Sequence, residues 1–521
     1  MCLRHIILIL ILAFFSRFAL GQESEPSPAT PDTTTMAARV DELLAARWRE
    51  EGVQPAPLSG DAEFMRRVYL DLTGVVPSVP RVRDFWGDDR NDKRARLIDS
   101  LLGSPVHATY LAGTWRRIML PGGVSQGQLK NAARLENWLR TQFAENIRYD
   151  RVVADFLMAA GDQSGPAFFY TSQDLKPEKL AASTARIFLG LQLQCAQCHD
   201  HFHDKWTQQD FWGYAAFFAR LNQAQDPRQQ NRVQLLDVDR GEVMLPDSDV
   251  IVRPKYPGGT LASDEGGGTR RMQLAVWTAS RDNPHLARAT VNRVWAQMFG
   301  RGLVNPVDDF GLNNPPSHPE LLEELSDFFV KNRFDLRELY RTLASTNAYQ
   351  LTSRSGDADP PPHFFARMAA KPLTPEQLYD SLNQSLMRRP DDQSPDSSTN
   401  SPLLDPNRQE FLAKMPLVAG SATEYQSGVL QALALINGSD IADASDPEES
   451  GLLLALQAPV FTDEGRIEAL MLATLSRPPS PEETSAFLAH LDGADSTSER
   501  RQALGDILWA LLNSAEFAMN H

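Results

Sequence analysis

The stretch PEKLAASTARIFLGLQLQCAQCHDHFHDKWTQQDFWGYAAFFARL, residues 177–221, decides the fold class of this 521-residue chain. It begins with a helical pattern and leads directly into a cluster of two cysteines and three histidines. After the cluster, Thr207 and Asp210 have the spacing of a capping box, and apolar residues from Phe211 to Leu221 recur along one helical face. The sequence therefore predicts that the cluster links two helices.

The same helical periodicity extends outward on both sides of this stretch. Upstream, Val40, Leu44 and Trp48 recur at three-and-four spacing, and downstream Asn283 and Pro284 have the cap-then-proline arrangement of a helix start. Between the helical regions, RVQLLDV, EVMLP and DVIVRP read as short strands separated by turn residues. We expect a mainly α fold, with two helical domains over residues 38–222 and 271–521 and a small β-strand insert over residues 223–270.

The N-terminus has the pattern of a secretory signal peptide. Arg4 precedes an unbroken apolar run from residue 6 to residue 15, and small residues lead to a predicted cleavage near Gly21. The apolar run is short for a membrane span of about 20 residues. We therefore expect an exported protein, periplasmic or at the cell surface, with no membrane span after cleavage of residues 1–21 and a Pro/Ser/Thr-rich flexible linker over residues 22–37.

The net charge and the cysteine count narrow the possible partners. Loss of Arg4 and Arg17 with the signal peptide takes the formal net charge from −16 to −18, which disfavours nucleic acid and anionic membranes as partners. Cys2 is removed with the same segment, so the mature chain keeps Cys195 and Cys198. Two cysteines do not make a disulfide framework, which indicates that these two act together.

The sequence Cys195-Ala-Gln-Cys198-His199 matches the covalent attachment signature of c-type haem. Two thiols three residues apart reach the two vinyl groups, and the adjacent histidine supplies the proximal iron ligand. His201 and His203 are too close in sequence to His199 to cross the ring easily to the sixth position. More distant candidates for that position are Met244, Met272, Met298 and His285.

Two other interpretations of the cluster remain open. Cys195 and Cys198 with two of His199, His201 and His203 would make a Cys2His2 zinc site, although the spacing is compressed for one. Alternatively, the cysteines form a short-loop disulfide or remain reduced, and the histidines are hydrated. A thioredoxin-like redox pair fits less well, because no βαβ pattern surrounds it.

Other polar groups have ordinary structural explanations. Asp308 and Asp309 are compatible with capping, with pairing to Arg293 or with acid–base chemistry. Asn313, Asn314 and His318 are compatible with a polar loop site, although capping of the following helix by Ser317 explains most of this pattern. Asn292, Arg293 and Trp295 are expected to hold a helix interface together. The sequence contains no nucleophile elbow, phosphate-binding glycine loop or HExxH helix.

Four segments resemble the planctomycete-type secreted proteins that pair domains of unknown function 1549 and 1553. They are RVYLDLTGVVPS at 67–78, the cysteine stretch at 190–221, NPHLARATVNRVWAQMFGRGLVNPVDDFGLNNPPSHPELLEEL at 283–325, and LLNSAEFAMNH at 511–521. The first domain is grouped with cytochromes because of its CxxCH. Where relatives have CHDHPF, this chain has Phe202 and His203, so the resemblance carries over to Cys195, Cys198, His199 and His201 but not to His203.

Three functions from different classes follow from these observations. The first is an exported cytochrome-like protein with haem c on Cys195, Cys198 and His199, which exchanges electrons with a redox partner protein. The second is a non-enzymatic surface or periplasmic binding module in which the CxxC is structural. The third is a metal-dependent hydrolase of extracellular polymers, with His199 and His201 as metal ligands. The sequence favours the first and favours a protein that is not an enzyme on its own.

Overall fold

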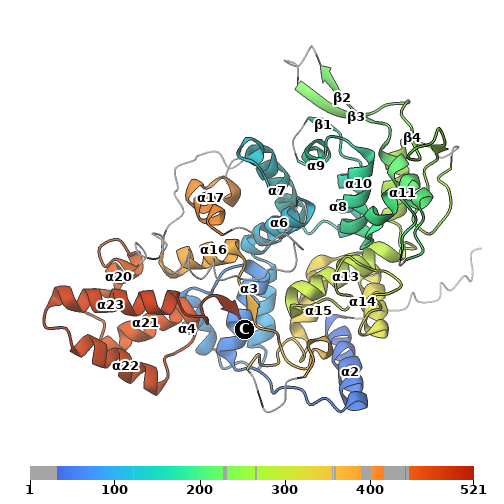
Figure 1. The fold of residues 1–521 in the computed structure, drawn as a ribbon. Helices are drawn as coiled ribbons and strands as arrows, with labels where there is room; N and C mark the ends of the chain where they lie inside the picture. Colours follow the sequence, from blue (N-terminus) through green and yellow to red (C-terminus); the bar gives the residue numbers. More distant parts are fainter. Residues whose placement is uncertain are drawn as a thin grey trace, which may run out of the picture. The chain divides into compact units, whose positions relative to one another are not determined.

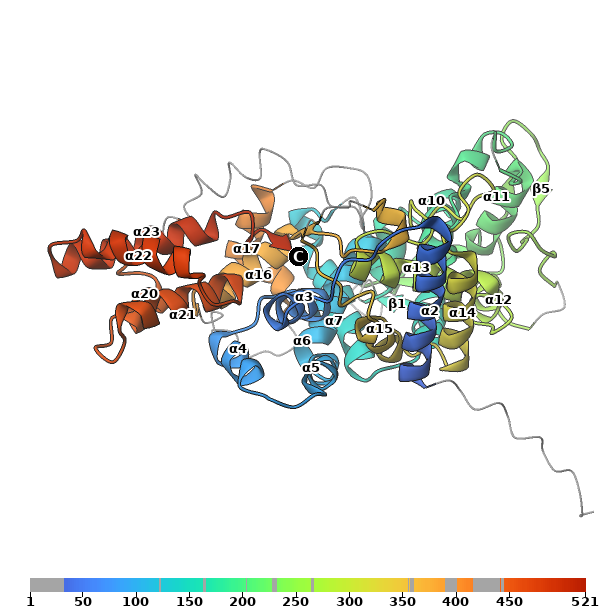
Figure 2. The same cartoon turned by 90° about the horizontal axis from the view of Figure 1, so that it is seen from below.

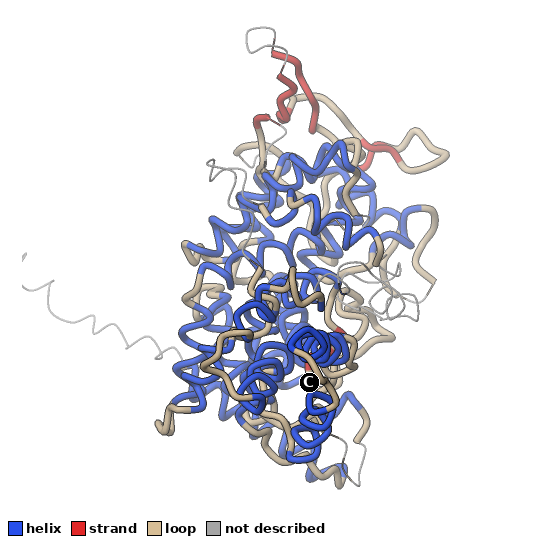
Figure 3. Tube along the Cα trace, turned by 90° about the vertical axis from the view of Figure 1, so that its left-hand side faces the viewer, coloured by secondary structure: helices blue, strands red, loops and turns tan. Residues whose placement is uncertain are grey.

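A computed structural model of the chain describes residues 32–120, 123–162, 165–202, 204–226, 232–263, 267–354, 356, 360–388, 401–415, 441 and 445–521. The signal peptide predicted at residues 1–21 lies outside these ranges. Residues 33–521 form one compact unit, in which helices predominate and the strands are short (Figures 1 and 3). Within the described residues, none of the helices combines the length and the apolar character that crossing a membrane requires.

The first domain is helical throughout, apart from the two-residue strand β1 (Figure 1). Its elements are α2 (Thr33–Glu51), α3 (Asp61–Thr73), α4 (Val79–Trp86), α5 (Lys93–Leu102), α6 (Pro105–Met119), η1 (Gln126–Gln128), α7 (Leu129–Ala144), α8 (Tyr149–Leu157), β1 (Gly161–Asp162), α9 (Ala167–Ser172), α10 (Pro177–Thr184), the π-helix η2 (Ala185–Leu189), and the 3-10 helices η3 (Leu193–Gln197) and η4 (Ala216–Phe218), with α11 (Gln208–Ala215) between the last two. The predicted capping box of α11 is confirmed, because the Thr207 side chain accepts from the Asp210 backbone N–H and Asp210 bonds back to Thr207.

The insert forms two small antiparallel sheets. Its strands are β2 (Leu221–Asp226), β3 (Arg232–Asp237), β4 (Val243–Met244) and β5 (Ile251–Val252). The three predicted strand segments contain β3, β4 and β5, but the prediction missed β2 and β1, which pair with β3 on either side. Figure 3 shows these strands gathered at one end of the helical body.

The second domain is again helical. Its elements are α12 (Arg270–Thr278), α13 (Pro284–Phe299), α14 (Pro319–Lys331), α15 (Leu336–Ser345), η5 (Pro362–Phe364), β6 (Lys371–Pro372), α16 (Pro375–Ser385), η6 (Pro402–Leu404), α17 (Pro406–Ala413), α20 (Gly451–Leu456), α21 (Asp463–Leu475), α22 (Pro481–Asp492), α23 (Thr497–Leu512) and β7 (Met519–Asn520). The Asn283 side chain accepts hydrogen bonds from the backbone N–H groups of His285 and Leu286, as the sequence predicted. The fold class is therefore confirmed: mainly α, with two helical domains and a small strand insert between them.

The two main clusters of buried apolar side chains do not coincide with the two domains. Helices α12 to α15 share one cluster of buried apolar side chains with the first domain, with α12 packed on α8 and α13 packed on η2. Helices α16, α17 and α20 to α23 contribute most of a second cluster, which also includes Leu70 and Val76 of the first domain. In Figures 1 and 2, α20 to α23 lie on the far side of α3 and α16 from the strands.

Three local predictions were wrong. Helix α2 begins at Thr33, inside the predicted linker, because Met36 and Ala37 are buried against the core. Helix α14 is preceded by His318 as its N-cap residue, without a side-chain cap from Ser317.

The third concerns the end of the chain, where the apolar periodicity of LGDILWALLNSAEFAMNH, residues 504–521, predicts one helix. Helix α23 instead ends at Leu512, and Met519–Asn520 form β7 against β6. The physical reason is a buried arginine from the first domain. The Arg66 guanidinium donates to the carbonyl groups of Glu516, Phe517 and Met519, and a continuous helix would use such carbonyls internally or leave them in solvent.

Candidate functional site

The cysteines lie in a tight turn between η2 and α11. Gly190 ends η2 in the left-handed region, at φ 68°, and a Cβ there would lie 2.6 Å from the ring of Phe310. The 3-10 helix η3 follows, with Leu193 and Ala196 buried. Because these two residues fix the inner side of the turn, Cys195 and Cys198 lie on its outer side, where both are exposed free thiols. Neither cysteine is in a disulfide.

The first turns of α11 hold the loop in place. The Asp200 carboxylate accepts from the Gln208 backbone N–H at 2.8 Å. The Gln208 side chain donates to the Cys198 carbonyl at 2.9 Å, and the Trp212 indole donates to the Gln197 carbonyl at 3.0 Å. The backbone around both cysteines is therefore fixed by polar contacts that do not use their side chains.

His199 is exposed beside the two thiols. Its Nδ1 lies 2.8 Å from the carbonyl oxygen of Asp200, and its ring centroid lies 4.3 Å from that of Phe202, a side chain that is 79% exposed. A hydrogen bond from Nδ1–H to a carbonyl leaves Nε2 as the nitrogen with a free lone pair. Within the described part of the chain, Nε2 of His199 has no hydrogen-bond partner.

The second domain closes over the inner side of this loop. The Phe310 backbone N–H donates to the Gly190 carbonyl at 2.9 Å, and Asp308 pairs with Arg186 at 3.1 Å. Asp308 thus pairs with an arginine of the first domain, and Arg293, the partner considered from the sequence, donates instead to the carbonyls of Arg186 and Ile187.

An acidic pair from the two domains faces this junction. A Cβ on Gly311 would lie 2.9 Å from Oδ2 of Asp204 and 3.6 Å from Oδ1 of Asp309. Burial raises the pKa of Asp309, and the negative charges of Asp308 and Asp204 raise it further, against an opposing effect of His201. The structure therefore brings the cysteine–histidine loop of the first domain and the Asp308–Asp309 loop of the second domain together.

A cavity of about 200 Å³ lies beside this junction, lined by Trp206 and Lys205 from the loop and by His285 and Arg288 from α13. Burial lowers the pKa of His285 to about 4, assisted by the positive charges of Arg288 and Lys205, so that its imidazole is neutral at pH 7.

The four candidates for a sixth ligand differ in position. His285 lines the cavity that loop residues also line, whereas Met298 is buried in the main core and Met244 and Met272 are exposed. The residues of the polar loop site considered from the sequence also differ in position. Asn314 lines the small cavity and donates to the Asp309 carbonyl, whereas His318 is buried against Phe365. His318 is therefore a core histidine.

The donor set of the cysteine turn fits covalent haem attachment. Two exposed free thiols precede a histidine whose Nε2 is available, which is the set that the attachment requires. The nearby cavity is lined by neither cysteine nor by His199, and its 200 Å³ is below the roughly 300–1,000 Å³ of sites that enclose a small molecule. The zinc and hydrolase alternatives require three or more metal ligands in one place, and the described ranges contain no such group of His, Cys, Asp and Glu. His203 lies outside those ranges.

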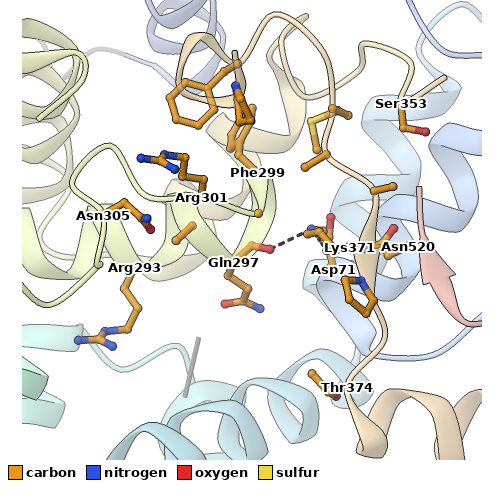
Figure 4. Close-up of a pocket in the computed structure, with 18 of the residues that line it drawn as sticks. Asp71, Arg293, Gln297, Phe299, Arg301, Asn305, Ser353, Lys371, Thr374 and Asn520 are labelled. Carbon is orange, nitrogen blue, oxygen red and sulfur yellow. Dashed lines mark hydrogen bonds and ion pairs between the residues drawn. The ribbon is translucent and has the colours of Figure 1, made fainter. Parts of the chain in front are cut away.

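A second site was not found from the sequence. A pocket of about 620 Å³ lies where the C-terminal part of α13, the segment that leads into β6, and α3 and α6 of the first domain meet (Figure 4). At its wall the Lys371 ammonium donates to Asp71 at 2.6 Å and to the carbonyls of Gln297 and Met298 at 2.9 and 2.7 Å. Asp71 also accepts from Tyr349 and Asn520, at 2.7 and 2.8 Å. Burial lowers the pKa of Lys371, and the Asp71 carboxylate opposes this effect.

Asp71 lies within one of the segments that carried the family resemblance, RVYLDLTGVVPS, but that segment gave no chemical reason to select it. Its partners Tyr349, Lys371 and Asn520 are far away in the sequence. Of the three α13 residues expected to hold a helix interface together, Arg293 donates to carbonyls of η2. Asn292 bonds to the backbone of Val304 and Val307, just beyond its own helix, and the Trp295 ring stacks on Phe299 within α13.

Comparison with protein families matches residues 39–223 to PSCyt2, a protein of unknown function (DUF1549), and residues 270–409 to PSD1, a protein of unknown function (DUF1553). The chain therefore pairs domains of unknown function 1549 and 1553, as the resemblance predicted. No curated protein and no solved structure has significant similarity to it. The junction between the CxxCH loop and the Asp308–Asp309 loop joins one matched region to the other.

Proposed function

We propose that this chain is an exported c-type haem protein that exchanges electrons with a partner protein. In this proposal Cys195 and Cys198 would hold the haem through thioether bonds, and His199 would bind its iron through Nε2. The haem, when bound, supplies reversible one-electron chemistry. Export to the periplasm or the cell surface follows from the signal-peptide pattern at residues 1–21 and provides the compartment in which such haem is attached.

The contact between His199 Nδ1 and the Asp200 carbonyl, at 2.8 Å, carries this proposal. Histidines that ligate metals commonly donate their other ring N–H to a carbonyl or carboxylate, which fixes the tautomer and the orientation of the ring. The structural alternative, a hydrated surface histidine, does not require this contact. The Asp200 side chain and Gln208 keep the backbone of the turn in place, so His199 and both thiols keep their positions before any group is attached.

Exposure of the turn supports a role in transfer between proteins. Both cysteines, His199 and Phe202 are exposed, so a group attached here is accessible to a second protein without opening the fold. His285, which is neutral at pH 7 and lines the adjoining cavity with Lys205 and Trp206, would be the residue of α13 to offer the iron a further nitrogen ligand.

The test is production in a host that attaches c-type haem, followed by intact mass and an absorption spectrum. We expect a mass increase of one haem and a Soret band. Cys195→Ser with Cys198→Ser should abolish both. His199→Ala should leave attachment possible but change the spectrum, whereas the matched variant His201→Ala should keep the spectrum of the unchanged protein. An unmodified mass from this host, or a spectrum that responds to His201→Ala and not to His199→Ala, would overturn the assignment.

A second candidate function, a binding module, is favoured by a different observation, the 620 Å³ pocket around Lys371. This pocket contains none of the residues of the cysteine loop. If binding is the main function, the double variant Cys195→Ser/Cys198→Ser should bind its ligand as tightly as the unchanged protein. Loss of binding in a folded double variant would contradict the binding-module alternative.

A further inference from the structure

The pocket around Lys371 is positively charged within an acidic protein. Among the residues that the structure describes, its lining contains Arg117, Arg293, Arg301, Arg367 and Lys371, and one acidic residue, Asp71. The whole chain, in contrast, has a formal net charge of −16. A concave positive site on a negatively charged protein concentrates small anions locally.

Two of these cations are already neutralised by the protein. Lys371 pairs with Asp71 at 2.6 Å, and Arg117 pairs with Glu376 at 3.2 Å. These pairs fix the wall of the pocket. They leave the charges of Arg293 and Arg301 to be considered.

Among the described residues, Arg293 and Arg301 have no carboxylate partner. Arg293 is 3% exposed, and its Nη2 donates to two backbone carbonyls, while its Nε has no hydrogen-bond partner within the described ranges. Arg301 is exposed at the pocket and makes no hydrogen bond or ion pair with any residue that the structure describes. In Figure 4 both arginines, with Asn305, lie across the pocket from Asp71, Lys371 and Asn520.

The opposite wall offers neutral hydrogen-bonding groups. Asn520 is 3% exposed, and its Nδ2 is used by Asp71, but its Oδ1 is buried without a partner among the described residues. Nε2 of Gln297 is also buried without a partner among the described residues, while its Oε1 accepts from the Tyr340 hydroxyl. Buried polar atoms are normally hydrogen-bonded, so the unpaired acceptor on Asn520 calls for a donor in the pocket.

We infer that this pocket binds a small hydroxylated acid, with its anionic group towards Arg293 and Arg301 and a hydroxyl donating to Oδ1 of Asn520. A volume of about 620 Å³ is in the range of small-molecule sites, and the side chains of Phe299 and Phe365 give part of the lining an apolar surface. Hydroxy acids and sugar acids share this chemistry. This site is separate from the cysteine turn, so the inference does not depend on haem attachment.

The experiment is isothermal titration of the purified protein at low salt with D-glucuronate, citrate, inorganic sulfate and D-glucose. We expect glucuronate or citrate to bind, and sulfate and glucose to bind at least about tenfold more weakly, since each lacks one half of the recognised chemistry. Glucuronate binding alone indicates a sugar acid, and citrate binding alone indicates a smaller hydroxy acid. If sulfate binds as tightly as either, the hydroxyl contact is wrong.

The variant Arg301→Gln tests the anionic contact, because Arg301 is exposed and its loss should not unfold the protein. We expect its dissociation constant to rise about tenfold, and Arg301→Lys to recover part of the loss. Arg281→Gln removes another exposed arginine outside the pocket lining and should leave binding unchanged. Equal weakening by Arg281→Gln and Arg301→Gln, or no binding of either acid, would overturn the inference.

Discussion

The cysteine turn and the Lys371 centre, which consists of Asp71 with its partners Tyr349, Lys371 and Asn520, differ in the exposure of their polar groups. In the turn, the reactive thiols of Cys195 and Cys198 are exposed. Hydrogen bonds from Gln208 and Trp212 of α11 hold the backbone around them. At the Lys371 centre, the charged groups are enclosed, and its members come from three distant parts of the chain: Asp71, the segment with Tyr349 and Lys371, and Asn520. The first arrangement keeps reactive atoms accessible. The second uses buried charge to join the two domains and the C-terminus.

This difference predicts where substitutions are costly. A buried ion pair that loses one partner leaves an uncompensated charge in a poorly solvated place, whereas an exposed group that loses a partner is rehydrated. Stability should therefore depend strongly on the Lys371 centre and weakly on the turn.

The largest effect is expected from Asp71→Asn. This change removes the counter-ion of Lys371 while keeping the shape of the side chain, and it should reduce the free energy of unfolding by about 3–5 kcal/mol. The measurement is chemical denaturation followed by circular dichroism. The double variant Asp71→Asn/Lys371→Met should recover most of the loss, because it removes the buried charge as well. A loss below about 1 kcal/mol in the single variant would mean that the centre does not hold the domains together.

The next largest effect is a pH dependence of the free energy of unfolding, which arises from the buried side chain of His107. His107 lies with Nδ1 2.7 Å from the Leu72 carbonyl, next in sequence to Asp71, and burial lowers its pKa to about 4. Between pH 6.5 and pH 4 the unfolded chain binds a proton that the folded chain does not, so stability falls as the pH falls through this interval. The loss attributable to His107 amounts to about 3 kcal/mol at pH 4.

Unfolding free energies measured at half-unit intervals from pH 7 to pH 4 test this prediction. The variant His107→Gln should have a flatter profile than the unchanged protein, while His199→Gln in the exposed turn should keep the original slope. Residual acid sensitivity in His107→Gln is expected from His285 and His318, because burial lowers the pKa of each to about 4 as well. Equal slopes for His107→Gln and His199→Gln would contradict the assignment.

The same contrast explains what the sequence could predict. The turn is local: CxxCH occupies five consecutive residues, and the Thr207–Asp210 capping box that follows it is recognisable from spacing alone. Helix α13 was predictable for the same reason, since Asn283, Pro284 and the apolar periodicity all lie within its own residues. Local patterns of this kind are the part of a fold that propensity and periodicity describe.

The Lys371 centre could not be predicted, because its contacts join residues about 300 to 450 positions apart, and nothing in their local sequence selects these partners. The prediction of a helix to the end of the chain was wrong for a related reason. The helical pattern continues past Leu512, but Arg66 of the first domain takes the carbonyls of Glu516, Phe517 and Met519. The pairing of β1 with β3 depends equally on residues that are distant in sequence.

A smaller effect is expected in the turn itself from Asp200→Ala. This change removes the side chain that accepts from the Gln208 backbone N–H at the start of α11, and loss of such a cap costs about 0.5–2 kcal/mol. Asp200→Asn keeps an acceptor oxygen and should lose less. Thermal unfolding of both variants measures the difference, and hydrogen exchange at residues 208–212 should rise in Asp200→Ala. Unchanged exchange there would indicate that the Thr207 cap alone holds the helix.

The smallest effect is expected from replacing both thiols. In protein made without haem attachment, Cys195→Ser/Cys198→Ser should change the free energy of unfolding by no more than about 0.5 kcal/mol, because both side chains are exposed and neither is in a disulfide. The same variant should lose haem completely in a host that attaches it. A large loss of stability would mean that the thiols are structural, and the turn would then resemble the Lys371 centre in its dependence on particular contacts. Small loss of stability with complete loss of haem would separate the two regions: one selected for accessible chemistry, the other for holding the domains together.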